Sequence, residues 1–500
     1  MGGGKQIRQA LERMRAAPFG LLLLAAIAMR WPAYGEWNYA IDDQYFALVG
    51  QRLLAGDLLY VDIWDRKPPL LYLTYAAIAA LSPSVFAYQF VATGFAALGA
   101  WGTTRIARLI APLPAALMAG IAYLALMTRF GGGNGEAAVF FNPLILFTAW
   151  SIASSIARLR QGALPRRVLL GMLSAGFAIG FKQSAAFEAA FFGIAVLVLL
   201  ARAGMDWRAL ALRALAMAAI GAAPLVLAAS FYCAVGHFPQ LWQALVLSNL
   251  ARAYDAGRLA RGLAMAGLLC LPLALAGAGY WQARPDRPAP LGFLACWTLA
   301  AIAGVAGFPG LYLHYALPLL APLMILAAPF FARPRIGAIG FLALVVLNLA
   351  TSDMFALGVR AKARPAAAAL VAQVRAVTPN RKLLVFGMPS YLYAEIGARP
   401  PSVLAFPPHF YEGAESRASG IDEVAELRRV LRTTPATVVV EEPIPAAPRN
   451  EATIAQLEIY LRTCHEVRRL RVYDHEGERR MAIHSDCRGS AVVMNGAPVR

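Results

Sequence analysis

Acidic and basic side chains gather in one stretch, residues 41–73, of an otherwise apolar chain. Asp42 and Asp43 are adjacent, and Lys67 stands directly before Pro68 and Pro69. A carboxylate held beside a hydroxyl group can remove its proton as a general base, and a lysine ammonium can neutralise a phosphate as a point charge. The stretch therefore indicates proton transfer next to a phosphate group, with a merely solvated acidic loop as the alternative.

Polar residues also stand at three other places where apolar segments begin or end: Asn134 with Glu136, Lys182 with Gln183, and His314 with Tyr315. Ionisable groups are expensive to hold at membrane depth, so they are functional candidates. Each group has a structural alternative as well. These alternatives are a glycine-rich turn with an exposed acid, a lysine that snorkels to the interface, and an aromatic belt residue.

Motifs for other reactions are absent from the sequence. It has no P-loop, no G-x-S-x-G, no H-E-x-x-H and no paired C-x-x-C. Its histidines are too scattered to predict a metal site, and Cys233, Cys270 and Cys296 fall inside apolar segments, where cysteine acts as a small apolar residue. We therefore expect no cofactor, while the sequence leaves a divalent metal ion open.

The composition is that of a membrane protein. Of 500 residues, 59% are hydrophobic and 15% are charged, and the mean hydropathy is +0.56, whereas soluble domains are about 45–50% apolar and about 25% charged. The net charge of +18 does not indicate nucleic-acid binding, because the Lys and Arg residues gather in every second loop, which is the positive-inside pattern. These basic loops, expected in the cytoplasm, hold Lys5, Arg8, Arg13, Arg15, Arg105, Arg108, Arg158, Arg160, Arg166, Arg167, Arg202, Arg208, Arg213, Arg284, Arg287, Arg333 and Arg335.

The apolar segments predict a polytopic helical domain over residues 1–352 with about eleven spans and a cytoplasmic N-terminus. A cleaved signal peptide is the alternative at the start, but Arg30 and Trp31 favour an uncleaved span that ends at the outer interface. The spans are expected at 17–34, 84–104, 112–128, 137–157, 168–201 (two short passes that meet at Lys182), 209–234, 260–281, 290–306, 315–332 and 336–352.

The acidic and basic stretch falls in the first outer loop, residues 35–83. Its apolar part, 68–81, is too short to span and is predicted to be an interfacial helix that begins at the two prolines. The connection 235–259 is amphipathic and aromatic, so it is also expected at the outer interface. We expect this connection and the C-terminal tail to shape a cleft for the acceptor.

A small α/β domain is predicted outside the membrane over residues 353–500. Strands are expected at 382–387 and 436–442, helices at 421–434 and 451–462, and a hairpin after these. Cys464 and Cys487 flank the hairpin, and an oxidising compartment permits a disulfide between them, with two free thiols as the alternative.

The motif D-D-x-Y-F-A followed by Y-x-D-x-W-D-x-K-P-P, between residues 36 and 75, resembles the first outer loop of GT-C-type glycosyltransferases. The branch it resembles holds protein O-mannosyltransferases, the lipid A aminoarabinose transferase and rhizobial galacturonosyltransferases. The resemblance implies catalytic roles for Asp42, Asp43 and Glu136, although Asp43 stands where the family usually has Glu. It implies phosphate contacts for Arg66, Lys67 and Lys182, and substrate contacts for Tyr45, Tyr60, Asp62, Asn134, Gln183, His314 and Tyr315.

The expected activity is transfer of a hexosyl or pentosyl group from a polyprenyl-phosphate donor to an acceptor hydroxyl on a glycan, lipid or protein. The resemblance implies the donor, and places the reaction on the outer face of a bacterial inner membrane. An Asp general base would invert the anomeric centre. The alternatives are a lipid-linked glycan flippase or other transporter, which should carry charges along a path through its spans, and an oligosaccharide polymerase.

Overall fold

The computed structural model describes residues 18–251, 257–286, 288–415, 418–433, 435–444, 448–475 and 477–488. Arg287 and the N-terminal basic cluster from Lys5 to Arg15 lie outside these ranges. The chain forms two compact units, of which unit 1 comprises 1–32, 89–228 and 258–355, and unit 2 comprises 33–88, 229–257 and 356–500. The division differs from the sequence-based boundary at residue 352, because the first outer loop groups with the C-terminal part.

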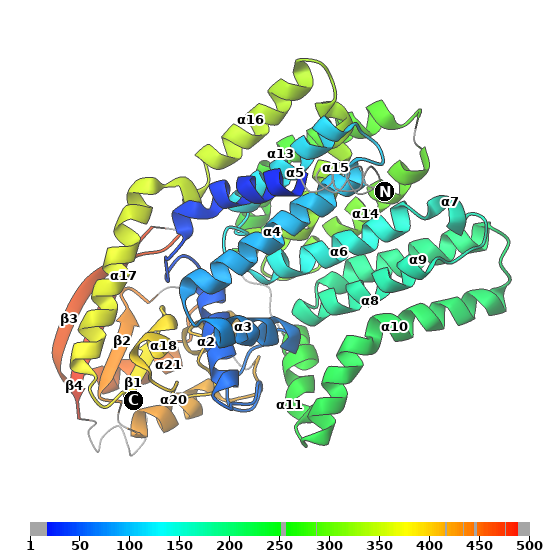
Figure 1. The fold of residues 1–500 in the computed structure, drawn as a ribbon. Coiled ribbons are helices and arrows are strands. Elements are labelled where there is room, and N and C mark those ends of the chain that lie inside the picture. The colour runs from blue at the N-terminus through cyan, green and yellow to red at the C-terminus, as the bar shows by residue number, and fades with distance from the viewer. Residues whose placement is uncertain are drawn as a thin grey trace, which may run out of the picture. The chain divides into compact units, whose positions relative to one another are not determined.

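Unit 1 is helical and contains most of the apolar segments (Figure 1). Six helices of the described chain are long and apolar enough to cross a membrane, namely Val85–Ala107, Ala185–Arg202, Trp207–Ala234, Arg258–Ala283, Ala289–Ala306 and Leu313–Phe331. The chain order is Pro18–Ala33, α4 (Val85–Ala107), α5 (Leu113–Arg129), α6 (Ala137–Ala153), α7 (Ile156–Leu159), α8 (Arg166–Phe181), α9 (Ala185–Arg202), α10 (Trp207–Ala234), α13 (Arg258–Ala283), α14 (Pro288–Ala306), η3 (Leu313–Ala316), α15 (Leu317–Phe331) and α16 (Ile336–Ala350).

The long apolar stretch 168–201 is broken in two, as its sequence predicts. Helix α8 ends at Phe181, and α9 begins at Ala185. Lys182 has an extended backbone, with φ −156° and ψ 129°, so it cannot continue the helix. The break holds a charged side chain between two apolar helices.

Small residues let the helices of unit 1 pack closely. Gly279 of α13 faces the backbone of α15 at Leu326, and a Cβ there would collide with that carbonyl oxygen. Helix α15 also packs against α5, and α6 packs against α8. Such close contacts between helix backbones gain packing energy that a larger residue would abolish.

Unit 2 begins with the first outer loop, which forms the helices α2 (Ile41–Leu54) and α3 (Pro69–Leu81). Pro69 occupies the first helical position, where its missing N–H costs nothing, and this confirms the predicted helix start. The two helices pack tightly at Gly50, because a Cβ added there would lie 2.7 Å from the backbone nitrogen of Ala76. This packing fixes the ends of the loop that joins α2 to α3.

The C-terminal part of unit 2 is built on a four-stranded sheet in the order β1-β2-β4-β3. The strands β1 (Leu383–Phe386) and β2 (Thr437–Glu441) run parallel and are buried throughout, as expected for apolar strands covered by helices. The strands β3 (Cys464–Tyr473) and β4 (Glu478–Cys487) form the predicted hairpin. The helices of unit 2 after α3 are α11 (Phe238–Trp242), a π-helical turn (Gln243–Leu247), α12 (Ser248–Leu250), α17 (Leu357–Val377), α18 (Tyr391–Ile396), α19 (Pro408–Tyr411), α20 (Glu423–Arg432) and α21 (Glu451–Leu461).

Side-chain caps begin two of these helices, and packing holds α17 to the sheet. The Asp422 carboxylate accepts a hydrogen bond of 2.9 Å from the backbone of Ala425 and begins α20, and Asn450 begins α21 in the same way. Helix α17 packs along β3, as Figure 1 shows. The sequence-based strands and both amphipathic helices of this domain are therefore confirmed.

Arg360 of α17 links the C-terminal part of unit 2 to the start of the first outer loop. Its guanidinium is buried, forms an ion pair with Glu36, and donates to the backbone oxygen of Asp474. Burial raises the pKa of Glu36 to about 7, although the positive charge of Arg360 opposes this shift. His475 and Tyr39 are joined as well, through the backbone oxygen of Tyr39 at 2.8 Å from the His475 ring.

A disulfide joins Cys464 and Cys487, which face each other across the open end of the β3–β4 hairpin. We expect Cys464→Ser/Cys487→Ser to lower the free energy of unfolding of this domain by about 3 kcal/mol, because the bridge closes a short loop in the unfolded chain. Thermal unfolding with and without reductant measures the effect. The wild type should lose stability in reductant and the double variant should not. Quantitative alkylation of both cysteines without reductant would contradict the bridge.

Candidate functional site

The two adjacent carboxylates lie in the first turn of α2 but differ in access. The Asp42 side chain keeps 21% of its surface exposed, whereas Asp43 is 1% exposed and accepts a hydrogen bond from the backbone of Gln44 at 2.9 Å. Both carboxylates lie at the N-terminal end of the helix, where the helix dipole is positive. Asp42 is the one of the two that a substrate can reach.

Lys67 lies close to Asp42, although the two are far apart in sequence. Its ammonium is 3.4 Å from the Asp42 carboxylate and 3.5 Å from that of Asp65. It also lies 4.6 Å from the centre of the Phe46 ring, on the next turn of α2, which is a favourable cation–π contact. The structure thus pairs the predicted base with the predicted phosphate ligand.

A strained turn brings Lys67 to this place. Tyr60 has a left-handed backbone with φ 70°, which is unfavourable for a bulky residue, and its N–H donates to the oxygen of Ile63 at 2.7 Å. The Tyr60 hydroxyl donates to the backbone oxygen of Lys67 at 2.7 Å, and the Tyr45 hydroxyl donates to that of Trp64 at 2.7 Å. Both tyrosines are buried, so in this structure they hold the loop of Lys67.

Asp65 is a residue of this site that the sequence argument did not single out. It is buried and accepts a hydrogen bond from the Tyr72 hydroxyl of α3. Burial opposes its ionisation, but the charge of Lys67 and the Tyr72 hydrogen bond outweigh it and hold the pKa of Asp65 below its usual value. Asp65 is therefore a permanent negative charge beside Lys67.

Arg66 and Asp62 are engaged within unit 2. The Arg66 guanidinium is paired with Glu415, and both side chains are largely buried. The Asp62 carboxylate accepts from the backbone of Leu58 at 2.8 Å and lies 3.8 Å from Arg399. The structure gives these two predicted ligands structural partners.

A second group of predicted residues comes together in unit 1. The Lys182 ammonium lies 3.1 Å from the Glu136 carboxylate and 4.8 Å from the centre of the Tyr315 ring. Glu136 directly precedes α6, Lys182 lies in the break between α8 and α9, and Tyr315 lies in η3. Gln183 follows Lys182 in the same break and is half-buried.

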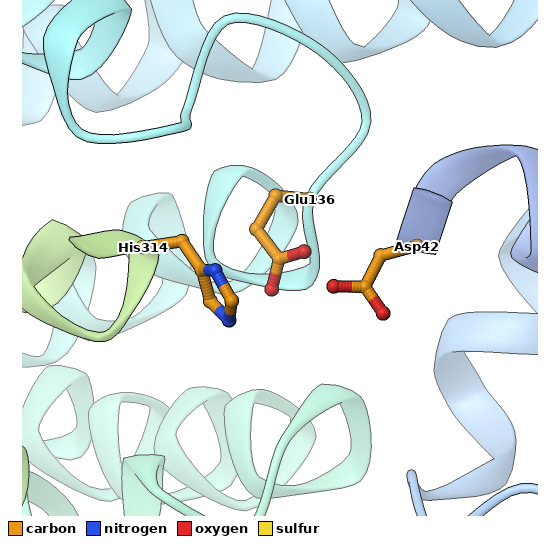
Figure 2. A group of neighbouring side chains, drawn as sticks. All are labelled: Asp42, Glu136 and His314. Atoms are coloured by element: carbon orange, nitrogen blue, oxygen red, sulfur yellow. The ribbon is translucent and has the colours of Figure 1, made fainter. Parts of the chain in front are cut away.

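His314 lies beside Glu136, and Figure 2 shows the two side chains facing each other. A ring nitrogen of His314 and a carboxylate oxygen of Glu136 lie within 4.8 Å. The imidazole also stacks on Tyr312 and meets Tyr315 edge-on at 4.7 Å. A carboxylate and an imidazole are suitable ligands for a divalent cation such as zinc or manganese. Glu136 and His314 bring one of each close together in unit 1.

Arg30 positions the loop that carries Glu136. The sequence predicts Arg30 at the outer end of the first span, and the structure buries its side chain to 3% exposure among polar groups of the protein. It donates to Thr93 at 3.1 Å and to the backbone oxygens of Gly132 and Asn134, the latter at 2.7 Å. A glycine-rich loop is costly to order, and Arg30 offsets this cost. Asn134 is itself buried.

We expect Arg30→Met to lower the free energy of unfolding by about 1–3 kcal/mol, because two buried carbonyl groups lose their donor. Hydrogen exchange followed by mass spectrometry should show reduced protection over residues 130–136. The control is Arg129→Met, which removes a looser pair at 3.9 Å from Asp353. Equal effects of the two substitutions would contradict the role of Arg30.

Comparison with known proteins gives the fold a class. No family model and no curated protein matches the sequence. Among solved structures, ArnT from Cupriavidus metallidurans bound to undecaprenyl phosphate is similar over 94% of this chain and 98% of its own, with a TM-score of 0.56 and 15% identity. Its apo structure is similar over 97% and 100%, with a TM-score of 0.58 and 15% identity.

An archaeal protein gives a similar result. The oligosaccharyltransferase of Archaeoglobus fulgidus, tethered with an acceptor peptide that contains the NVT sequon, is similar over 85% of this chain and 68% of its own. Its TM-score is 0.51, at 12% identity. ArnT, a lipid A aminoarabinose transferase, and this enzyme are GT-C glycosyltransferases, and the chain shares their fold. The resemblance drawn from the sequence motif is thus confirmed at the level of the fold.

Proposed function

We propose that this protein is a GT-C glycosyltransferase of a bacterial inner membrane, which transfers a hexosyl or pentosyl group from a polyprenyl-phosphate donor to an acceptor hydroxyl. The observation that carries the proposal is the pairing of Lys67 with Asp42 at 3.4 Å. It places a carboxylate that can accept the proton of a hydroxyl beside a cation that can bind a phosphate. The fold of ArnT, which has been solved with undecaprenyl phosphate, supports the class of donor.

In the proposed reaction, Asp42 accepts the proton of the acceptor hydroxyl. The hydroxyl oxygen attacks the anomeric carbon, the bond from that carbon to the phosphate oxygen breaks, and polyprenyl phosphate leaves with the electron pair. Attack opposite to the leaving phosphate inverts the anomeric centre. Lys67 stabilises the charge that develops on the phosphate, and Lys182 and Arg66 are the further candidate cations. Glu136 is the supporting carboxylate that orients the acceptor or the base.

The bonds around Lys67 suit this role. At 3.4 and 3.5 Å, its contacts with Asp42 and Asp65 are longer than strong charged hydrogen bonds. An incoming phosphate can therefore displace them at modest cost, and Asp42 is then released to accept a proton. Arg66 would first have to leave Glu415 in order to contribute.

The remaining predicted contacts belong to the same proposal. The proposed acceptor classes are lipid, glycan and protein, and the proposed substrate contacts are Asn134, Gln183, His314 and Tyr315. Because Tyr45, Tyr60 and Asp62 are engaged with the backbone of their own loop, we assign them an indirect part, through the position of Lys67.

The test is mass spectrometry of membrane glycolipids and glycans from cells with and without the protein, followed by transfer in proteoliposomes from a defined polyprenyl-phosphate sugar. The proposal requires a glycan, lipid or protein that gains a sugar only when this protein is present. Transfer is expected to continue in the presence of a chelator, because the proposed reaction uses only side chains of the protein. Loss of transfer that added zinc or manganese restores would instead show that a metal ion is required, with Glu136 and His314 as its candidate ligands.

We also propose about eleven spans, a cytoplasmic N-terminus, and residues 353–500 on the outer face of the membrane. The alternation of basic loops supports this topology. A reporter that is active only outside the cytoplasm should be active when fused after residue 353. A fusion that is active only in the cytoplasm would overturn the topology and the proposed reaction with it.

Transport without catalysis is the alternative from another class. A transporter needs charged groups along a path through its spans. Glu188, a buried acid of α9, instead accepts a hydrogen bond of 2.6 Å from the Trp297 ring of α14. That bond gives Glu188 a structural partner between two helices. An oligosaccharide polymerase shares the lipid-linked substrate, and the acceptor product found by mass spectrometry separates it from a single-sugar transferase.

A further inference from the structure

Lys67 contacts a residue from the C-terminal part of the chain. Its ammonium lies 5.9 Å from the centre of the Phe406 ring, in addition to the 4.6 Å contact with Phe46. Phe406 packs in turn on Tyr45, with ring centres 4.9 Å apart. The ammonium therefore contacts two aromatic rings, Phe46 from α2 and Phe406 from the C-terminal part.

The segment around Phe406 is bound to the loop of Lys67 at further points. The backbone N–H of Trp64 donates to the oxygen of Val403 at 2.9 Å, and the Trp64 ring meets the His409 ring at 4.9 Å. At the far end of the segment, Glu415 forms the ion pair with Arg66. Backbone, aromatic and charged contacts thus hold residues 403–415 against residues 64–67.

His409 makes this contact surface apolar. It is buried between Trp64 and Phe406, whose ring centre lies 5.3 Å from its own. Burial lowers the pKa of His409 to about 3, so the imidazole is neutral at physiological pH. A neutral, aromatic surface lowers the local dielectric constant and strengthens the interaction of Lys67 with any anion that reaches it.

We propose that residues 403–409 form a wall of the donor-phosphate site and that Phe406 is a positioning residue for the Lys67 ammonium. This inference rests on the proposed function and extends it, because it assigns part of the donor site to the C-terminal domain. An aromatic face attracts the ammonium without accepting a strong hydrogen bond. Phe406 and Phe46 therefore fix the position of the charge without competing for its N–H groups, which donate to Asp42 and Asp65 until a phosphate displaces them.

The experiment measures binding of undecaprenyl phosphate to the purified full-length protein, so that it does not depend on the sugar. The variants are Phe406→Leu, which removes the ring, and Phe406→Trp, which keeps one. The matched control is Phe410→Leu, the same change four positions along, at a buried ring that stacks on Phe386 in the domain core. The rate at which an amine-reactive reagent modifies Lys67 is measured in parallel by mass spectrometry.

Phe406→Leu should raise the dissociation constant of undecaprenyl phosphate about 3- to 30-fold, from the usual strength of a cation–π contact. It should also speed modification of Lys67, while Phe406→Trp restores both values and Phe410→Leu changes neither. In transfer assays the same loss should fall on the donor KM and spare kcat. Equal behaviour of Phe406→Leu and Phe410→Leu would overturn the role of Phe406 and leave the proposed function standing. Failure of the wild type to bind undecaprenyl phosphate would overturn the proposed function and the donor wall together.

Discussion

Asp42→Asn is expected to fold and to bind undecaprenyl phosphate, yet to transfer sugar about 10²–10⁴-fold more slowly, because an amide of the same shape cannot accept the proton. The Asp42 carboxylate lies beside Lys67 and is accessible, which is the arrangement a base for an incoming hydroxyl needs. The measurement is kcat for transfer in proteoliposomes, with binding of undecaprenyl phosphate recorded on the same preparation.

Asp43→Asn is the matched control for this prediction. Asp43 is 1% exposed and hydrogen-bonded within its own helical turn. Its substitution should therefore lower the free energy of unfolding and have a smaller effect on kcat than Asp42→Asn. Wild-type transfer by a folded Asp42→Asn protein would refute Asp42 as the base. If a folded Asp43→Asn protein were inactive and Asp42→Asn were active, Asp43 would be the base in place of Asp42.

Lys67→Ala is expected to weaken binding of undecaprenyl phosphate about 10²–10³-fold, which is the usual cost of removing one partner from a buried charged contact. Its side chain is 14% exposed and lies between the carboxylates of Asp42 and Asp65. Without the ammonium, these carboxylates repel each other and any phosphate. Titration of binding at increasing ionic strength measures the effect, which should shrink as salt screens the charges.

Two controls accompany this prediction. Lys67→Arg keeps the charge and should retain a larger share of binding than Lys67→Ala. Lys382→Ala removes an exposed lysine of the C-terminal domain and should leave binding unchanged. If Lys67→Ala bound undecaprenyl phosphate as well as Lys382→Ala does, Lys67 could not be a phosphate ligand.

Local sequence patterns were sufficient for some of the helices and strands, whereas α2 and α17 were not predicted. Pro68 and Pro69 predict the start of α3, and Lys182 predicts the break between α8 and α9. The apolar runs 382–387 and 436–442 predict the two buried strands β1 and β2. Such patterns depend on neighbours within a few residues, which is why a single sequence reveals them.

The candidate residues of the first outer loop were also proposed from the sequence, through one motif. The adjacent acids, the tyrosines and Lys67 lie within a single loop, so their order and spacing carry the resemblance to GT-C glycosyltransferases. Their roles within the loop did not follow. The backbone bonds of Tyr45 and Tyr60 depend on a left-handed turn at Tyr60, and no residue type there predicts it.

Contacts between distant parts of the chain were decided by the tertiary structure alone. Phe406, His409 and Glu415 carry no motif, and they reach the loop of Lys67 because unit 2 folds the first outer loop together with residues 356–500. In the sequence, Arg30 is a charge at the end of an apolar span. Only the tertiary structure shows that the loop of Glu136 is bound to it. The sequence by itself indicated the fold class, the apolar segments and the candidate site residues, because local periodicity and a motif confined to one loop encode them. The supporting groups around those residues come from remote segments, and their proximity depends on how the whole chain packs.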